Sequence, residues 1–248
     1  MTRDEGRAGV LEDSEIERVL VMTAHPDDVD FGAAGTVSSW TNAGIEVVYC
    51  ICTDGDAGGF DPAVDRADIP GIRRAEQRAA AKVVGVEDVR FLGYPDGRLV
   101  SSIELRRDLS RVIRQVRPQR AVIQSPDRNW ARVGASHPDH LAAGEAAMAA
   151  IYPDARNPFA HVELLRDEGL EDWAISETWV MAHPDNNHHV DITDVFDTKM
   201  AALRAHESQT AHMDDLQDRL LQWYGANATA AGLPEGRLAE RFLVVSTA

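Results

Sequence analysis

The chain is organised around residues 24–32, which read Ala24-His25-Pro26-Asp27-Asp28-Val29-Asp30-Phe31-Gly32. An apolar run at 19–22 precedes this stretch and predicts a buried strand, and the Gly-Ala-Ala-Gly-Thr-Val sequence at 32–37 predicts the start of a helix. One imidazole and two adjacent carboxylates therefore fall in a tight turn at the carboxyl end of a strand, where open α/β sheets bind their ligands. Because Pro26 fixes its own φ and restricts His25, the turn holds these side chains in set directions.

A second motif of the same kind lies at residues 136–140, which read Ser136-His137-Pro138-Asp139-His140. It follows an apolar run at 121–124 and a loop. Pro138 suits the first position of a helix, and the sequence predicts that this helix continues through 148. His137 and His140 are three residues apart and so face the same side of its first turn. We expect the two motifs to meet across a sheet.

Composition limits the class of protein. A chain of 248 residues with 44% hydrophobic content is expected to form one large α/β domain. Its net charge of −16 and pI near 4.9 argue against a nucleic-acid or anionic-membrane partner. There is no apolar run of about 18 residues and no apolar signal-peptide region. Cys50 and Cys52 are expected to be reduced core residues, so the sequence predicts a cytoplasmic protein.

Strand and helix patterns alternate along the chain. Strands are predicted at 19–23, 45–52, 89–92, 121–125, 173–181 and 190–193. Helices are predicted at 32–42, 72–84, from a capping box of Ser101 and Glu104 to just before Pro118, and at 194–207 and 214–230. This alternation favours an α/β fold with a doubly wound, mostly parallel sheet and helices on both faces. Residues 1–17 are charged and aperiodic and are expected to form a mobile acidic tail, with a single domain over 18–248.

Three side chains have the ligand types of a catalytic metal site. His25, Asp28 and His140 provide nitrogen and oxygen donors that suit zinc and leave a coordination position open for water. The same set of two histidines and one carboxylate also suits non-haem iron(II). The sequence therefore predicts zinc, with iron(II) as the alternative.

The remaining polar groups of the two motifs suit hydrolysis of an amide or ester. Asp27 is a spare carboxylate that is expected to take a proton from water. His137 is expected to stabilise the developing oxyanion or to protonate the leaving group, and Asp139 to fix the tautomer of His137.

Each pattern also has a simpler interpretation. The first motif alone is compatible with a surface turn, and the second with a helix cap and exposed histidines. Gly32-x-x-Gly35 is a weak phosphate-loop signal that we interpret as close helix–sheet packing. The arginines at 73, 74 and 78 are typical of a solvated helix face, and the histidines at 183, 188 and 189 of a polar loop. The occurrence of both motifs after strands favours a site.

Taken together, the two motifs resemble the PIG-L (LmbE-like) family of zinc-dependent N-acetylglucosaminyl deacetylases. Segments at 72–76, 91–97 and 190–193 are also similar to family segments. In one departure, the Glu that often follows the aspartate pair is replaced by Val29, with Asp30 next.

The resemblance implies a Rossmann-like fold with zinc on His25, Asp28 and His140. It also implies that Asp27 is the general base and that His137 supports the oxyanion. Arg73 matches the arginine that family members use near the sugar or its attached group, so it is expected to bind substrate.

The leading hypothesis is thus a zinc-dependent hydrolase that removes an N-acetyl or similar acyl group from an amino-sugar-containing small molecule. Conjugates of the mycothiol, bacillithiol and glycopeptide-antibiotic type all stay open, as does a homo-oligomer. The alternatives are an iron(II) oxygenase that uses the same ligands and a nucleotide-binding Rossmann-like module.

Overall fold

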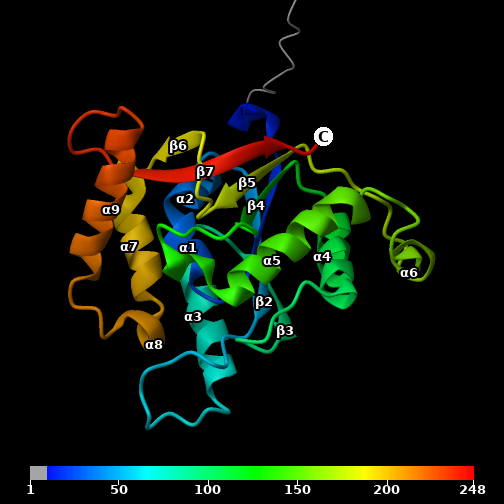
Figure 1. The fold of residues 1–248 in the computed structure, drawn as a ribbon, viewed down its shortest axis with the longest axis horizontal. Helices are drawn as coiled ribbons and strands as arrows, with labels where there is room; N and C mark the ends of the chain where they lie inside the picture. Colours follow the sequence, from blue (N-terminus) through cyan, green and yellow to red (C-terminus); the bar gives the residue numbers. More distant parts are fainter. Residues whose placement is uncertain (1–9) are drawn as a thin grey trace, which may run out of the picture.

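All strands of the described chain, residues 10–248 of this computed structural model, pair in one seven-stranded sheet of order β3-β2-β1-β4-β5-β7-β6 (Figure 1). The strands are β1 (Arg18–Thr23), β2 (Glu46–Thr53), β3 (Asp88–Tyr94), β4 (Arg120–Gln124), β5 (Glu177–Met181), β6 (His188–Asp191) and β7 (Ala239–Ser246). β1 to β5 are parallel to one another, and β7 runs antiparallel to both β5 and β6. The expected mostly parallel α/β sheet is confirmed.

The order of strands reverses beside β1, which has β2 on one side and β4 on the other. In an open α/β sheet, such a switch point leaves a crevice at the carboxyl ends of the strands. The first motif follows β1 and the second follows β4, so both motifs come from the two strands that flank this crevice.

Helices cover both faces of the sheet, as expected. In Figure 1, α4 and α5 lie on one face and α2, α3 and α7 on the other, while α9 packs along β7. The helices are α1 (Asp28–Gly32), α2 (Ala34–Asn42), α3 (Ile69–Val83), α4 (Ile103–Val116), α5 (Pro138–Ala149), α6 (Val162–Arg166), α7 (Phe196–Arg204), α8 (Glu207–Thr210) and α9 (Leu216–Ala230). Within residues 10–248, none of them combines the length and apolar composition of a membrane span.

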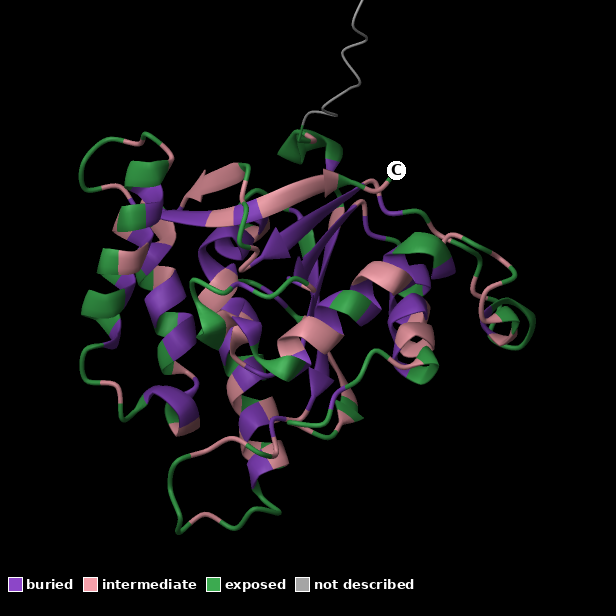
Figure 2. Cartoon of the chain, in the orientation of Figure 1, coloured by how far each residue is buried: buried purple, intermediate pink, exposed green. Residues whose placement is uncertain are grey.

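The core consists of apolar layers on the two faces of the sheet. Figure 2 shows the central strands as buried, with the helices buried on their inner sides only. The layer under α4 and α5 contains Cys50 and Cys52, which are both free and buried. They are core residues, as the sequence predicts.

The helix predicted over 32–42 begins earlier and is broken. The chain turns into α1 at Asp28, and Ala33 leaves helical geometry before α2 starts. A Cβ on Gly32 would come within 2.5 Å of the Met181 sulfur, and one on Gly35 within 2.8 Å of Ile192. These close contacts support the close-packing interpretation of the two glycines, and the amides of Gly35 and Thr36 donate to the Glu240 carboxylate.

Several details of the predicted elements are wrong. The strand predicted over 173–181 begins only at Glu177, and the helix predicted over 194–207 covers Phe196–Arg204. Helix α4 is capped one residue later than expected, by Ser102, whose side chain accepts a hydrogen bond from the Leu105 amide. The last strand, β7, was not among the predicted strands, although its Phe-Leu-Val-Val run carries a strand signal.

The sequence predicts a mobile tail over residues 1–17. Residues 1–9 lie outside the described residues, and residues 10–17 are ordered against the fold. Residues 10–17 pack on the sheet, because Arg120 reaches them from β4. The Arg120 guanidinium is fully buried between Trp40 and Trp179 and pairs with Glu177 at 2.5 Å and Asp13 at 2.6 Å.

Candidate active site

The first motif forms a tight turn between β1 and α1. Asp27 precedes α1 with φ 94° and ψ −24°. Residues other than glycine rarely adopt this left-handed backbone conformation. Asp28 begins the helix, and its Oδ2 accepts a hydrogen bond of 2.6 Å from the His25 amide. The two neighbouring carboxylates therefore leave the turn in different directions.

The second motif meets the first as expected, so that His25, Asp28 and His140 converge. The Nδ1 of His25 lies 3.2 Å from the Nε2 of His140 and 3.4 Å from the Oδ2 of Asp28. The Nε2 of His140 lies 2.9 Å from the Oδ1 of Asp28. Ligand atoms of a tetrahedral zinc site, at bonds of about 2.0–2.1 Å, are separated by about 3.3 Å. The spacing of this donor set is compatible with a divalent metal.

Two further carboxylates hold the opposite edge of the His25 ring. Its Nε2 lies 2.9 Å from Asp96 and 3.2 Å from Asp139. Contacts of this kind keep the proton on Nε2 and leave the Nδ1 lone pair for a metal. Burial opposes protonation, but the charges and hydrogen bonds of Asp28, Asp139 and Asp96 raise the pKa of His25 to about 12. This excess of negative charge around one imidazole is what a bound cation would neutralise.

Asp139 does not orient His137 through its carboxylate, contrary to the expectation from sequence. Its oxygens accept from the amides of Gly97 and Leu99 and face His25. The backbone N–H of Asp139 instead donates to the Nδ1 of His137 at 3.2 Å. The reason is local: the side chain of a residue in the first turn of α5 points back toward the amino end, over the crevice.

His137 lies at the mouth of the site. Its ring is edge-on to His25 with 5.1 Å between ring centroids. Because its Nδ1 accepts from a backbone amide, the neutral ring carries its proton on Nε2. Burial and the charges of His25 and His140 lower the pKa of His137, which favours this neutral form.

Asp27 is held by a buried arginine. The Arg73 guanidinium donates to Asp27 Oδ2 at 2.9 Å and also to the carbonyls of Pro26 and Gly55. Only 3% of Arg73 is exposed. The sequence predicted that Arg73 contacts substrate, with a solvated helix face as the simpler interpretation. In the structure Arg73 is buried and instead holds the turn and the Asp27 carboxylate in place. Burial raises the pKa of Asp27 to about 6, although Arg73 opposes the shift.

A buried polar network that the sequence analysis missed supports the same turn. Gln77 on α3 accepts from the Asp27 amide at 2.8 Å and donates to Asp30 at 2.8 Å. His206, between α7 and α8, lies 2.9 Å from the same Asp30 oxygen. Asp30, the residue beside the family departure at Val29, thus links three helical segments. Its partners are distant in sequence, so no local signal identifies them.

Asp96 was also missed, although its position carried a signal. It lies in the Gly-Tyr-Pro-Asp-Gly turn at the end of β3, at the same edge of the sheet as the two motifs.

By contrast, His183, His188 and His189 belong to no group of potential metal ligands among the described residues. Besides His25, Asp28 and His140, the described residues bring together His25 with His137 and His140, and His25 with Asp96 and Asp139, as potential metal ligands.

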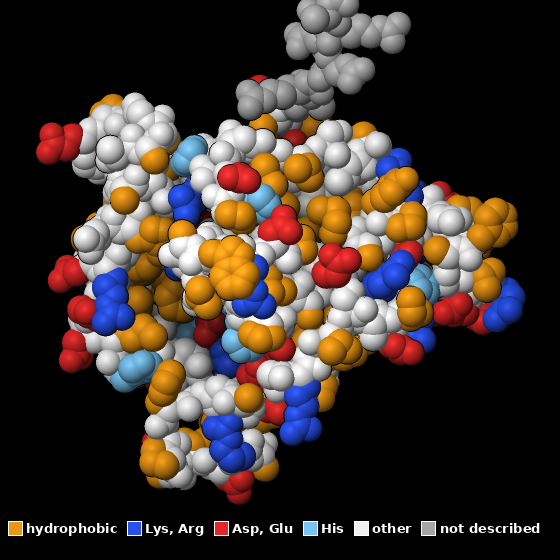
Figure 3. Space-filling view, in the orientation of Figure 1, with side chains coloured by type: hydrophobic (Ala, Val, Ile, Leu, Met, Phe, Trp, Pro, Cys, Tyr) orange, Lys and Arg blue, Asp and Glu red, His pale blue; other side chains and the backbone are white. Residues whose placement is uncertain are grey.

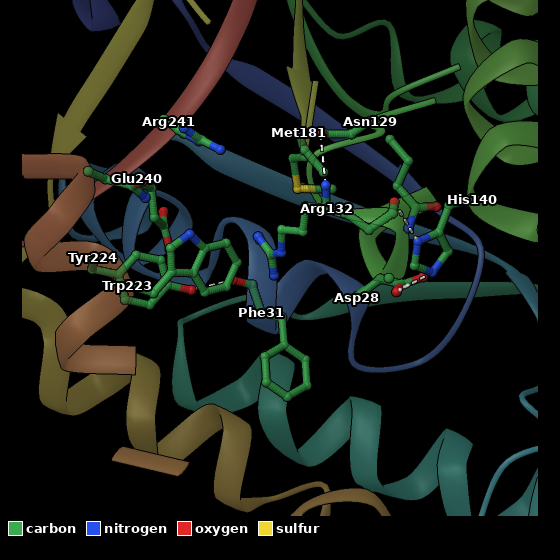
Figure 4. Close-up of a pocket in the computed structure, with 16 residues that line it drawn as sticks. Asp28, Phe31, Asn129, Arg132, His140, Met181, Trp223, Tyr224, Glu240 and Arg241 are labelled. Carbon is green, nitrogen blue, oxygen red and sulfur yellow. Dashed lines mark hydrogen bonds and ion pairs between the residues drawn. The ribbon is translucent and has the colours of Figure 1, made fainter. Parts of the chain in front are cut away.

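A pocket extends from the donor set toward β7 and α9. It contains about 910 Å³ of empty space, part of it open to solvent, and Figure 4 shows Asp28 and His140 at one end and Trp223 and Tyr224 at the other. Near the middle of the face drawn in Figure 3, histidine side chains lie beside acidic and basic ones. The site is therefore a charged hollow with an adjoining pocket, large enough for a molecule of sugar size.

Comparison with known proteins connects this geometry to a family. The sequence profile described as "PIG-L: GlcNAc-PI de-N-acetylase" matches residues 20–151. A diacetylchitobiose deacetylase of Thermococcus kodakarensis is 33% identical over 196 residues, which cover 79% of this chain and 71% of that protein. A probable N-acetyl-alpha-D-glucosaminyl L-malate deacetylase 2 of Bacillus cereus is 33% identical over 204 residues, which cover 79% of this chain and 84% of that one.

A solved structure shows the same architecture over nearly the whole chain. The N,N'-diacetylchitobiose deacetylase from Pyrococcus horikoshii, in complex with an inhibitor, superposes with a TM-score of 0.84 at 29% sequence identity. The match covers 94% of this chain and 85% of that one.

Proposed function

The chain belongs to the PIG-L family of de-N-acetylases, and from this we propose that it hydrolyses the N-acetyl amide of an amino-sugar-containing small molecule. The observation that carries the proposal is the convergence of His25, Asp28 and His140 beside a carboxylate outside the donor set, Asp27, and a neutral imidazole, His137. All three similar proteins described above are named as deacetylases, of diacetylchitobiose or of N-acetyl-alpha-D-glucosaminyl L-malate.

Zinc is the proposed metal, held by His25, Asp28 and His140. Although burial opposes it, the charges of His140 and His25 hold the pKa of Asp28 well below its usual range, so Asp28 is a carboxylate ready to bind a cation. When bound there, a divalent metal supplies a Lewis acid that lowers the pKa of a water molecule and polarises the acyl carbonyl. Iron(II) fits the same donors, and metal analysis distinguishes the two.

Asp27 is the proposed general base. It is next to Asp28 in the chain but is not one of the three donors, and its carboxylate is fixed by Arg73. With a pKa near 6, it is ionised at neutral pH and yet basic enough to accept a proton from the attacking water.

His137 is the proposed hydrogen-bond donor to the oxyanion and, later, to the leaving amine. Its Nε2–H is the tautomer that the Asp139 amide selects, and the ring lies at the open side of the site. A donor already in place needs no reorganisation as negative charge develops on the acyl oxygen.

Two alternatives lack support in the structure. A nucleotide phosphate would need the backbone amides of Gly35 and Thr36, which donate to the Glu240 carboxylate instead. The doubly wound sheet also differs from the jelly roll expected for an iron(II) oxygenase of this ligand type.

The experiment is a screen for acetate and free amine over N-acetylglucosamine conjugates. Metal-free protein is compared with protein reloaded with zinc or iron(II). Release that requires zinc supports the proposal, and no release from any conjugate would refute it. His25→Ala and His140→Ala should each lose tight metal binding, whereas near-normal metal content in both would refute the ligand assignment.

A further inference from the structure

The pocket beside the metal site carries two positive charges on its walls. Arg132 comes from the loop before α5, and Arg241 from β7. In Figure 4, Arg132 lies between the Asp28 and His140 pair and Trp223, and its guanidinium is 3.7 Å from the centroid of the Trp223 ring. We refer to Arg132 and Arg241 as the arginine pair.

The arginine pair has no hydrogen-bonding or ion-pair partner among the described residues. Neither guanidinium makes a hydrogen bond to the protein or an ion pair with a carboxylate in residues 10–248. Other amide and charged side chains of the pocket are engaged: Gln124 accepts from the Ala24 amide, Asn129 from the Arg132 amide, Asn227 donates to the Ala239 carbonyl, and Glu240 pairs with Lys199. Among the charged side chains that line the pocket, the two arginines are thus the hydrogen-bond donors left without a protein partner within residues 10–248.

This arrangement is unusual for a chain with a net charge of −16, in which carboxylates outnumber arginines and lysines. Two cations that share a pocket repel each other. Burial lowers the pKa of Arg132, and the neighbouring charge of Arg241 lowers it further. An anion placed between them would relieve the repulsion and satisfy the donors, since a guanidinium binds carboxylate and phosphate groups in a two-pronged geometry.

We propose that the arginine pair binds an anionic substituent of the substrate, a proposal that rests on the deacetylase function proposed above. The acetamido group lies at the metal end of the pocket, and a carboxylate or phosphate attached to the sugar lies at the other end. The substrate class is then an N-acetylglucosamine conjugate that carries a negative charge away from its acetamido group.

The test measures binding to metal-free protein by calorimetry, so that it does not depend on turnover. The neutral probe is methyl N-acetylglucosaminide. The anionic probes are N-acetylmuramic acid, for a carboxylate, and N-acetylglucosamine 1-phosphate, for a phosphate. We expect at least one anionic probe to bind more tightly than the neutral one, and the tighter of the two identifies the anion.

Arg132→Gln and Arg241→Gln should each weaken binding of that anionic probe by about 10- to 100-fold, because a charge-assisted hydrogen bond is lost. Binding of the neutral probe should change much less. The matched control is Arg219→Gln, which removes the same charge from an exposed part of α9 outside the pocket and should change both affinities by less than about twofold. Arg241→Lys, which keeps the charge, should restore part of the affinity.

Equal losses for neutral and anionic probes would overturn the proposal, as would equal affinities of all probes for the unmodified protein. Acetate release by zinc-loaded protein distinguishes failure of this proposal from failure of the proposed function. Acetate release without tighter binding of anionic probes would contradict anion binding by the arginine pair only. Tighter binding of anionic probes without acetate release would contradict the deacetylase function only.

Discussion

At the scale of single residues, Asp27 combines a strained backbone with the proposed proton acceptor. Its positive φ costs on the order of 1–3 kcal/mol, which hydrogen bonds from Arg73 and to Gln77 help to offset. Asn tolerates the same backbone region. Asp27→Asn should therefore keep the fold and the metal but lose the base, so that kcat falls by about 10²–10⁴-fold.

Metal content and kcat, measured on the same preparation of Asp27→Asn, check this prediction. The matched variant is Asp28→Ala, which should lose the metal. Retained metal in Asp28→Ala together with lost metal in Asp27→Asn would reverse the two roles, and full activity of Asp27→Asn would assign the base elsewhere.

Arg73 is the second residue whose role the structure redefines. Its guanidinium contacts Asp27 and two backbone carbonyls and is buried, so it is a positioning residue. Arg73→Lys cannot reproduce these bonds and should lower kcat with little change in KM. Steady-state kinetics of Arg73→Lys and of exposed Arg78→Lys, on the same helix, give the comparison; a rise in KM alone would restore the substrate-binding role.

At the scale of elements, the contact of His206 with Asp30 ties the α7–α8 junction to α1. Burial opposes the charge on His206, but the hydrogen bond and charge of Asp30 raise its pKa above the ordinary value of 6.5. A raised pKa means that the pair stabilises the fold fully below pH 6.5 and that this contribution is lost as the pH rises through the folded-state pKa.

His206→Ala should therefore lower the free energy of unfolding by about 3–5 kcal/mol below pH 6.5, and by less at higher pH. Urea unfolding of metal-free protein at several pH values measures this dependence. The exposed His212→Ala is the control and should show no such trend; a loss that grows with pH would contradict the pairing.

Arg120 connects another pair of elements, the segment at 10–17 and the strands β4 and β5. Its removal in Arg120→Met leaves the Glu177 carboxylate buried without its cation, which should cost about 3–5 kcal/mol of stability. Asp13 is half exposed, so Asp13→Asn should cost less than about 1 kcal/mol. Denaturant midpoints of the two variants give the test, and similar losses in both would mean that the exposed pair dominates.

At the scale of the whole molecule, the sequence predicted the layered α/β fold because strands and helices alternate regularly as far as β4. The two motifs predicted the metal donor set because each follows one of the two strands, β1 and β4, between which the strand order reverses. The supporting groups Gln77 and His206 were not predictable, since only the tertiary fold brings them to Asp30. The reversed direction of β7 depends on pairing with two strands that lie far from it in the chain.

The position of β7 has a consequence for synthesis. It is translated after the other six strands of this sheet, yet it lies inside the sheet, between β5 and β6. Until residues 239–246 leave the ribosome, β5 presents an open edge and β6 has no strand to join, so the nascent chain exposes surfaces that invite wrong pairing. Both histidine motifs are by then long completed, but Glu240 has not yet reached Lys199 and the amino end of α2. The last strand to join this sheet thus inserts between two strands that are already made.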